Sequence, residues 1–352
     1  MNALRVPVDR ASPDDSGSRP VAGGVALHPG DTVGGKYLLL HQLSAGGMGQ
    51  VWCAQNSSTG AEVAVKTVLS SLASSSEAVE RFRDEARATA QLAHRGIVRA
   101  FDLVEPEDER GPVLLVMELL RGHTLAQRLA NFGPLSIDET LAIALPVLAA
   151  LSHAHSAGVV HRDVKPDNIF LALDPDGELS PKVIDFGVSQ LRCWGRSTRR
   201  DALAVGTPWY MSPEQARGEE VDGRCDVFGV GILLYECLSG THPFRALGGR
   251  RSTDRRRAPP RIPTIPATLW AAIARALAER PEDRFSSAAD LALALSTVRA
   301  KLHARRPVRL VHALGILATA LVVVSFLYGP AVPSVLAQTT VASPTPTCAC
   351  ER

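Results

Sequence analysis

Residues His161–Phe170, with the sequence HRDVKPDNIF, are the most informative part of the chain. Asp163 carries a carboxylate that can accept a hydroxyl proton, and Lys165 can neutralise charge on a phosphate. Asn168 offers an amide oxygen to a hard cation such as Mg²⁺. A polar turn would explain His-x-Asp alone, but the full string is too specific for that. Together these groups suit phosphoryl transfer to a hydroxyl.

A glycine-rich segment, Leu43–Val51 (LSAGGMGQV), lies upstream between two predicted strands. Its glycines would let backbone N–H groups approach phosphate oxygens without a Cβ in the way. Hairpin turns are often glycine-rich, so this segment alone is weak evidence. It is followed by Ala64-Val65-Lys66 in the third predicted strand. The short β-type runs predict strands at residues 37–43, 51–56, 62–68, 98–103 and 113–118.

Further motifs follow the central string. Asp185-Phe186-Gly187 comes at the end of a predicted strand, 17 residues after Asn168, and its aspartate suits a second Mg²⁺ ligand. Helices are predicted at 77–93 and 138–156, the second with Pro146 as a bend or a point that needs tertiary support. Asp226 opens an apolar helix that runs through Leu238.

In this order the motifs resemble those of the protein kinases over about residues 36–300. The segments Gly46–Gly49 and Ser212–Gln215 are similar to those of the bacterial eukaryotic-like (Hanks-type) serine/threonine kinases. The resemblance implies an α+β, two-lobed kinase fold with ATP between the lobes. The β-rich N-lobe would span about 36–120 and the helical C-lobe about 121–302.

The resemblance also implies residue roles. Asp163 and Lys165 would be catalytic, together with Lys66 and its helical partner Glu85. The metal ligands would be Asn168 and Asp185. The nucleotide would be held by Leu43, Ser44, Ala45, Gly46, Gly47, Met48, Gly49, Gln50, Val51, Ala64, Lys66, Glu118 and Leu120. Ser44 departs from the family, which has its first loop glycine there, and predicts a stiffer loop with weaker nucleotide affinity.

Two structural roles follow from the same resemblance. Asp226 matches the buried aspartate that braces the catalytic loop, and Arg284 matches the arginine that pairs with Glu214. Ser212 stands where the family usually has alanine. The segment 245–266 fits poorly, because it is rich in Arg, Gly and Pro where the family has a docking helix, and a solvated linker is the preferred interpretation.

The expected cofactors are ATP and Mg²⁺, with Mn²⁺ as an alternative metal, and the expected substrates are protein Ser and Thr hydroxyls. Lys165 resembles the serine/threonine class rather than the tyrosine class. Arg162 before the catalytic aspartate predicts activation by loop phosphorylation, preferably at Ser197 or Thr198, with one copy of a homodimer acting on the other. Two alternatives stay open: a pseudokinase scaffold and a small-molecule phosphotransferase.

The amino-acid composition limits which partners and which cellular compartment we expect. A net charge of +2 and a pI near 8.3 give no general argument for nucleic acid, and no such partner is expected. Four scattered cysteines read as reduced cytosolic thiols, and two more, Cys348 and Cys350, stand apart near the C-terminus with no role assigned. Residues 1–35 lack hydrophobic periodicity and a signal-peptide core, and we expect a disordered lead.

The C-terminal part predicts a membrane anchor. Residues 310–328 are almost wholly apolar and would span about 28 Å as a helix, close to a bilayer core of about 30 Å. A basic juxtamembrane segment, 303–309, precedes them, and residues 329–347 carry no charge. By the positive-inside rule the kinase domain, 36–302, would be cytoplasmic and the tail, 329–352, extracytoplasmic.

Overall fold

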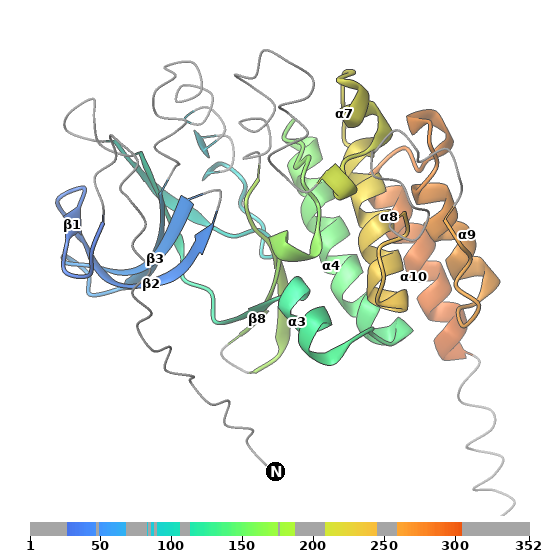
Figure 1. Cartoon of the computed structure of the whole chain (residues 1–352), viewed down its shortest axis with the longest axis horizontal. Coiled ribbons are helices and arrows are strands. Elements are labelled where there is room, and N and C mark those ends of the chain that lie inside the picture. Colours follow the sequence, from blue (N-terminus) through green and yellow to red (C-terminus); the bar gives the residue numbers. More distant parts are fainter. Residues whose placement is uncertain are drawn as a thin grey trace, which may run out of the picture. The chain divides into compact units, whose positions relative to one another are not determined.

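The computed structural model describes residues 27–46, 49–67, 83, 86–87, 90–105, 113–174, 177–186, 208–244 and 259–304. The chain divides into two compact units, residues 1–299 and 300–352. All elements discussed here belong to the first unit, apart from the last residues of its C-terminal helix. Within this unit strands gather in the N-terminal part and helices in the C-terminal part (Figure 1). The predicted α+β, two-lobed architecture is therefore confirmed.

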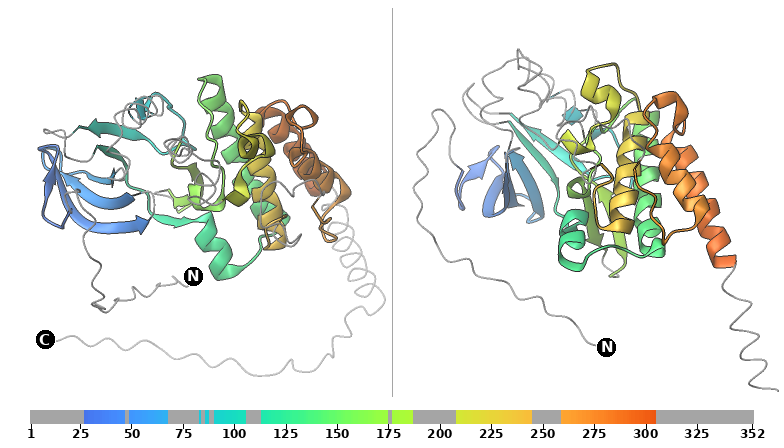
Figure 2. Two further views of the ribbon diagram at one scale, coloured as in Figure 1. Left: turned by 45° about the horizontal axis from the view of Figure 1, so that its top comes forward. Right: turned by 45° about the vertical axis from the view of Figure 1, so that its right-hand side comes forward.

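A six-stranded antiparallel sheet forms the N-lobe, in the order β1-β2-β3-β4-β6-β5 (Figure 2). Its strands are β1 (Thr32–Val33), β2 (Tyr37–Gly46), β3 (Gly49–Asn56), β4 (Glu62–Thr67), β5 (Ala100–Val104) and β6 (Leu114–Glu118). The five predicted strands correspond to β2–β6. Strand β2 runs beyond its predicted end because its pairing with β3 continues until Gly46 lies opposite Gly49. The glycine-rich segment is thus the tip of a hairpin.

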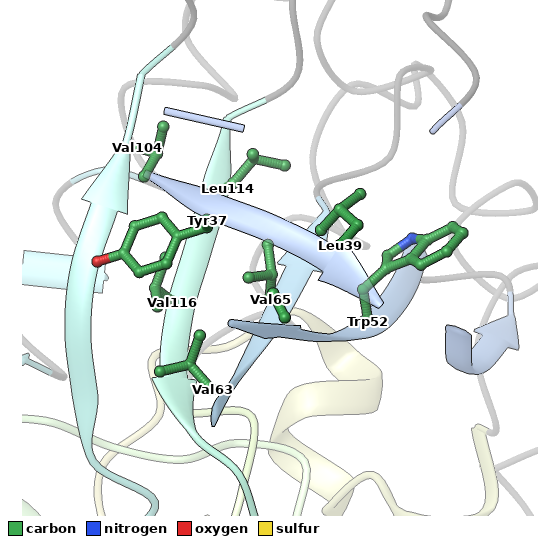
Figure 3. Close-up of a cluster of buried hydrophobic side chains, with 9 residues drawn as sticks. Tyr37, Leu39, Trp52, Val63, Val65, Val104, Leu114 and Val116 are labelled. Carbon is green, nitrogen blue, oxygen red and sulfur yellow. The ribbon is translucent and has the colours of Figure 1, made fainter. Parts of the chain in front are cut away.

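The two faces of this sheet have different partners. One face carries a buried hydrophobic cluster, to which Val63 and Val65 of β4 belong (Figure 3). Ala64 lies between them and packs with a second cluster on the opposite face. Side chains alternate along a strand, so Lys66 shares the face of Ala64. A slip of β4 by one residue would carry Lys66 into the hydrophobic core, so the core fixes the position of this lysine.

The C-lobe consists of helices and a small three-stranded sheet. The helices are α3 (Leu125–Phe132), α4 (Ile137–Ser156), α7 (Pro213–Arg217), α8 (Arg224–Ser239), α9 (Ala267–Ala276) and α10 (Ala288–Ala304). The sheet is formed by β7 (Gly122–Thr124), β8 (Ile169–Leu173) and β9 (Leu179–Val183). Three helices begin with a capping box, in which an N-cap hydroxyl and the side chain three residues later satisfy each other's backbone N–H groups. The N-cap residues are Thr124, Ser136 and Ser212.

Helix α8 is the buried centre of this lobe. It packs against α4 and α9, and nearly all of its side chains are buried, which explains why its sequence is apolar without a polar face. Asp226 lies in its first turn and is 1% exposed. At Gly229 an added Cβ atom would lie 2.8 Å from the Cβ of Val164. The glycine therefore allows α8 to approach the segment that follows Asp163.

Helix α4 continues through Pro146 without interruption. Its neighbours Val147 and Leu148 are fully buried, so tertiary packing supports the predicted weak point. Among the described residues, α4 is also the helix that is long and apolar enough to cross a membrane, but half of it is buried in the protein. The predicted span at 310–328 lies outside the described residues.

Several other expectations also fall outside those residues. They concern most of the N-terminal lead, Glu85 and the activation segment with Ser197 and Thr198. Of the helix predicted at 77–93, residues 83, 86, 87 and 90 are described and helical, whereas residues 91–93 are described and not helical, so the predicted end of this helix is wrong. Of the poorly fitting segment 245–266, residues 259–266 are described and contain no helix before α9 begins.

Candidate active site

The predicted catalytic side chains meet in the turn between α4 and β8. Nζ of Lys165 lies 2.6 Å from Oδ2 of Asp163. Nδ2 of Asn168 donates to the same oxygen at 3.1 Å and to the backbone carbonyl of Asp163 at 2.8 Å. A short 3₁₀ turn, η1 (Pro166–Asn168), brings the amide back towards the carboxylate. The structure thus brings the three groups together within one loop.

The backbone of this loop is held in an unusual conformation. Arg162 has a φ of 65°, a left-handed value that residues with a Cβ rarely adopt. Asp226 accepts hydrogen bonds from the backbone N–H groups of His161 at 2.8 Å and Arg162 at 2.7 Å. Its Oδ2 also lies 2.8 Å from Nε2 of His155 at the end of α4. Asp226 therefore braces the loop, as predicted.

The ionisation of Asp226 suits this task. Burial by itself would raise its pKa, but the hydrogen bond from His155, the charges of the two histidines and the His161 N–H outweigh burial and lower the pKa below its ordinary value. The carboxylate is therefore ionised near neutral pH. In that form it accepts all three hydrogen bonds.

A pocket of about 640 Å³ opens above this loop. It is lined by residues from β2, β3, β4, β6, the β6–β7 connection, α3 and the catalytic loop. The predicted residues that line it are Leu43, Ser44, Ala45, Val51, Ala64, Lys66, Glu118, Leu120, Lys165, Asn168 and Asp185. Asp163 lies at its edge, bonded to two of them.

The predicted role of Gln50 in holding the nucleotide stays a prediction, and its side chain makes other contacts. Gln50 does not line the pocket: its Oε1 accepts from the indole N–H of Trp52, and its backbone N–H donates to Thr67 Oγ1. Val51 lines the pocket, so its neighbour along the strand must point the other way. Gly46 and Gly49 pair at the hairpin tip, and Gly47 and Met48 lie outside the described residues.

Sequence analysis also missed lining residues. Met117 and Val98 contribute apolar surface beside Ala64, and Phe170, the second residue of strand β8, also lines the pocket. The local signal for Phe170 was its place in the quoted string, two residues after Asn168. Asp167 lies in the same string, whereas Thr124 and Gln127 carry no such local signal.

Lys66 and Asp185 form the charged wall of the pocket. Nζ of Lys66 lies 2.7 Å from Oδ1 of Asp185, and the Lys66 side chain is 7% exposed. Burial alone would raise the pKa of Asp185, but Lys66 outweighs burial through its charge and hydrogen bond, and the pKa lies below its ordinary value. The predicted pairing of Lys66 with Glu85 stays a prediction, because Glu85 lies outside the described residues.

The donor atoms fit a Mg²⁺–nucleotide complex. Asp185 offers an ionised carboxylate, and Asn168 uses its Nδ2 on Asp163, so that its Oδ1 is the acceptor it presents. Mg²⁺ takes only one or two protein carboxylates when phosphates and waters complete its shell. Asn168 and Asp185 are the residues that would hold the ion.

The connection between the lobes is cross-linked beside the pocket. Glu118 accepts from Lys182 Nζ at 2.7 Å and from the backbone N–H of Arg99 at 2.9 Å. Residues 96–98 bond to both backbone groups of Val183, at 2.8 and 3.0 Å. These contacts tie the end of β6 to strand β9, which leads directly to Asp185. No sequence pattern predicted the Glu118–Lys182 pair.

The Glu214–Arg284 pair anchors the end of the activation segment. Two parallel hydrogen bonds of 2.6 and 2.7 Å join the side chains, which are buried. Burial by itself would raise the pKa of Glu214, but the hydrogen bonds and charge of Arg284 outweigh it and lower the pKa. The predicted pairing is confirmed.

The protein kinase domain model matches residues 37–295. The chain is 38% identical over 274 residues to the serine/threonine-protein kinase Pkn1 of Myxococcus xanthus, covering 76% of this chain and 39% of that protein. It is 38% identical over 285 residues to the serine/threonine-protein kinase PknA of Mycobacterium tuberculosis, covering 80% of this chain and 64% of that one. The chain therefore spans less than two thirds of the length of these relatives.

A solved structure gives the same result for the fold. The crystal structure of the Mycobacterium tuberculosis PknI kinase domain is 28% identical to this chain and superposes with a TM-score of 0.63. The match covers 77% of this chain and 99% of that domain. Fold, pocket and loop geometry agree with these matches, and the chain belongs to the protein kinase family, among the bacterial Hanks-type serine/threonine kinases.

Proposed function

We propose that the chain is an ATP- and Mg²⁺-dependent serine/threonine protein kinase. The observation that carries this proposal is the single pocket into which Lys66, Lys165, Asn168 and Asp185 converge, with Asp163 bonded at its edge. Family membership and the printed names of the relatives support the same activity and substrate class.

The proposal gives each group a task. Mg²⁺–ATP, when bound, supplies the phosphoryl group and a cation that neutralises its charge. Asp163 accepts the proton of the substrate hydroxyl, and Lys165, 2.6 Å from it, places positive charge beside the attacking oxygen. Lys66 binds the phosphates on the opposite wall. Catalysis then rests on positioning and charge neutralisation, without a covalent intermediate.

The two alternatives are less well supported. A pseudokinase scaffold would not need Asp163, Asn168 and Asp185 in one constellation. A small-molecule phosphotransferase would not need the anchored activation segment that ends at Glu214. The relatives are named as protein kinases, which also favours a protein substrate.

The test is transfer of labelled phosphate from ATP to a protein rich in Ser and Thr, using the full chain with Mg²⁺. We expect transfer that stops when the metal is chelated and that falls by at least about 10²-fold in Asp163→Asn, because general-base contributions are typically of that size. Nucleotide binding that persists in this variant shows that the pocket is intact. Wild-type protein that binds ATP and transfers nothing would favour the scaffold.

A membrane anchor at 310–328 is a further part of the proposal. It is supported by the apolar run and by Arg305, Arg306 and Arg309 before it. A periplasm-active phosphatase fused after Arg352 should be active in a bacterial host, and the same enzyme fused at Ala300 should be inactive. The opposite pattern would reverse the orientation, and activity at neither site would contradict a span.

Autophosphorylation between copies is the proposed switch. Arg162 can bind a phosphate on Ser197 or Thr198 bidentately, and tethering would concentrate the copies in two dimensions. Mass spectrometry should find phosphate at these sites in the active protein and not in Asp163→Asn. Full activity of the double variant Ser197→Ala, Thr198→Ala would contradict this switch.

A further inference from the structure

The peptide group that precedes Asp163 is held at both of its polar atoms. Its N–H, which belongs to Asp163, donates to Nδ1 of His161 at 3.2 Å. Its carbonyl, which belongs to Arg162, accepts from Nε2 of Gln215 at 2.8 Å. Because Arg162 has the left-handed φ of 65°, the orientation of this peptide depends on such external partners.

Gln215 makes this contact from α7, 53 residues away in the sequence. Its side-chain Oε1 accepts from the backbone N–H of Ser212 at 2.9 Å, which is the return bond of the capping box of α7. Its Nε2 is the atom that reaches Arg162. One amide therefore joins the helix that ends the activation segment to the loop that carries the catalytic carboxylate.

A capping role alone does not require this amide. The return bond of a capping box needs only an acceptor oxygen, and glutamate serves there as well as glutamine. A carboxylate in the first turn would also interact favourably with the helix dipole. Within the part of the chain that the structure describes, the N–H₂ half of the amide donates to the catalytic loop.

We propose that Gln215 is a positioning residue for Asp163. Together with Asp226, which binds the N–H of Arg162, it holds both backbone groups of the strained residue. The carboxylate of Asp163 then stays within contact distance of Lys165 and Asn168. This inference rests on the proposed kinase activity, since it concerns the geometry of that reaction.

The decisive variant is Gln215→Glu. It keeps the oxygen that accepts from Ser212 and replaces the donor by a second oxygen facing the carbonyl of Arg162. We expect kcat for protein phosphorylation to fall by about tenfold or more, since small misplacements of catalytic groups have effects of that size. KM for ATP should change less than about twofold, because no lining residue of the pocket is altered. The melting temperature should stay within a few degrees of wild type.

The matched control is Ser212→Ala. It removes the hydroxyl that caps α7 and leaves the Gln215–Arg162 bond in place. We expect a lower melting temperature and, at a temperature well below unfolding, a nearly unchanged kcat. If Gln215→Glu has wild-type kcat, or if both variants lose kcat in proportion to their stability, Gln215 only caps the helix and the proposal is wrong.

A second experiment compares one substitution in two backgrounds, so its result does not depend on whether a single variant folds. Arg162→Gly and Arg162→Ala both remove the side chain, but only glycine adopts a positive φ without strain. Gln215→Met, which lacks the donor, should therefore reduce kcat more in the alanine background than in the glycine background. Equal effects in both backgrounds would overturn the proposal. An inactive wild type would instead refute the kinase activity itself.

Discussion

The Glu214–Arg284 pair gives the sharpest stability prediction. The guanidinium of Arg284 has no exposed area, and it makes the two bonds to Glu214 described above. It also donates to the backbone carbonyls of Ala278, Arg224 and Glu279 at 2.9, 3.0 and 3.0 Å. Arg284→Met removes all of these donors at once. The carboxylate of Glu214 and the three backbone carbonyls then lose the hydrogen bonds that they accept from Arg284.

The loss of stability expected for Arg284→Met follows from the bonds that it removes. Removing one partner of a buried ion pair typically destabilises a protein by about 3–5 kcal/mol. For a domain of this size each kcal/mol shifts the melting temperature by about 2–4 °C, so Arg284→Met should lower it by about 6–20 °C. Glu214→Gln should cost about 1.5–3 kcal/mol, because glutamine keeps the shape and one acceptor and the carbonyls still share the positive charge.

Urea unfolding followed by circular dichroism measures both variants, with the slope of the transition checked for constancy. The control is Arg217→Met, which breaks the exposed pair of Arg217 with Glu219 and should leave the midpoint nearly unchanged. If Arg284→Met costs under about 1 kcal/mol, the pair does not anchor α7. If Glu214→Gln costs as much as Arg284→Met, the carbonyl bonds contribute nothing.

The remaining predictions concern catalysis, packing and acid. Lys66→Met should abolish phosphoryl transfer while the protein stays folded by circular dichroism, and unchanged transfer would mean that another residue holds the phosphates. Gly229→Ala should cost about 1–3 kcal/mol in urea unfolding and also lower kcat, because the new methyl group meets Val164 behind the catalytic loop. The lowered pKa values of Glu214 and Asp226 predict stability that is complete above about pH 4.3, near the unfolded-state values, and that is lost as pH falls through the lower folded-state values. A melting temperature that does not fall in acid would contradict the pH prediction.

Local spacing was sufficient for the centre of the site. Asp163, Lys165 and Asn168 lie within six residues, so a single turn brings them together, and their meeting could be expected from the sequence. The same holds for Lys66, whose face of the sheet follows from the alternation of β4 around Val63 and Val65. Applied to β3, the same alternation puts the side chain of Gln50 on the face opposite to that of Val51.

Long-range polar contacts could not be predicted from local spacing or from strand alternation. Glu118 and Lys182 are 64 residues apart, and Gln215 and Arg162 are 53 apart. Each of these side chains is of a type that usually faces solvent, so neither periodicity nor composition marks it. Their contacts depend on how α7 and β9 pack against the rest of the lobe, which only the folded chain determines.

The segment 96–98 has a mechanical consequence. It precedes β5 of the N-lobe sheet in the chain, yet its backbone is bonded to Val183 of β9 in the C-lobe. If the N-lobe sheet rotates while residues 96–98 stay bonded to β9, the chain must bend where it enters β5, at Arg99–Ala100. The other crossing lies at Leu119–Arg121, just after Glu118 is fixed to Lys182. Arg99 and Glu118 are bonded to each other, so these two short pivots, 20 residues apart in the chain, would define one axis about which the pocket opens and closes.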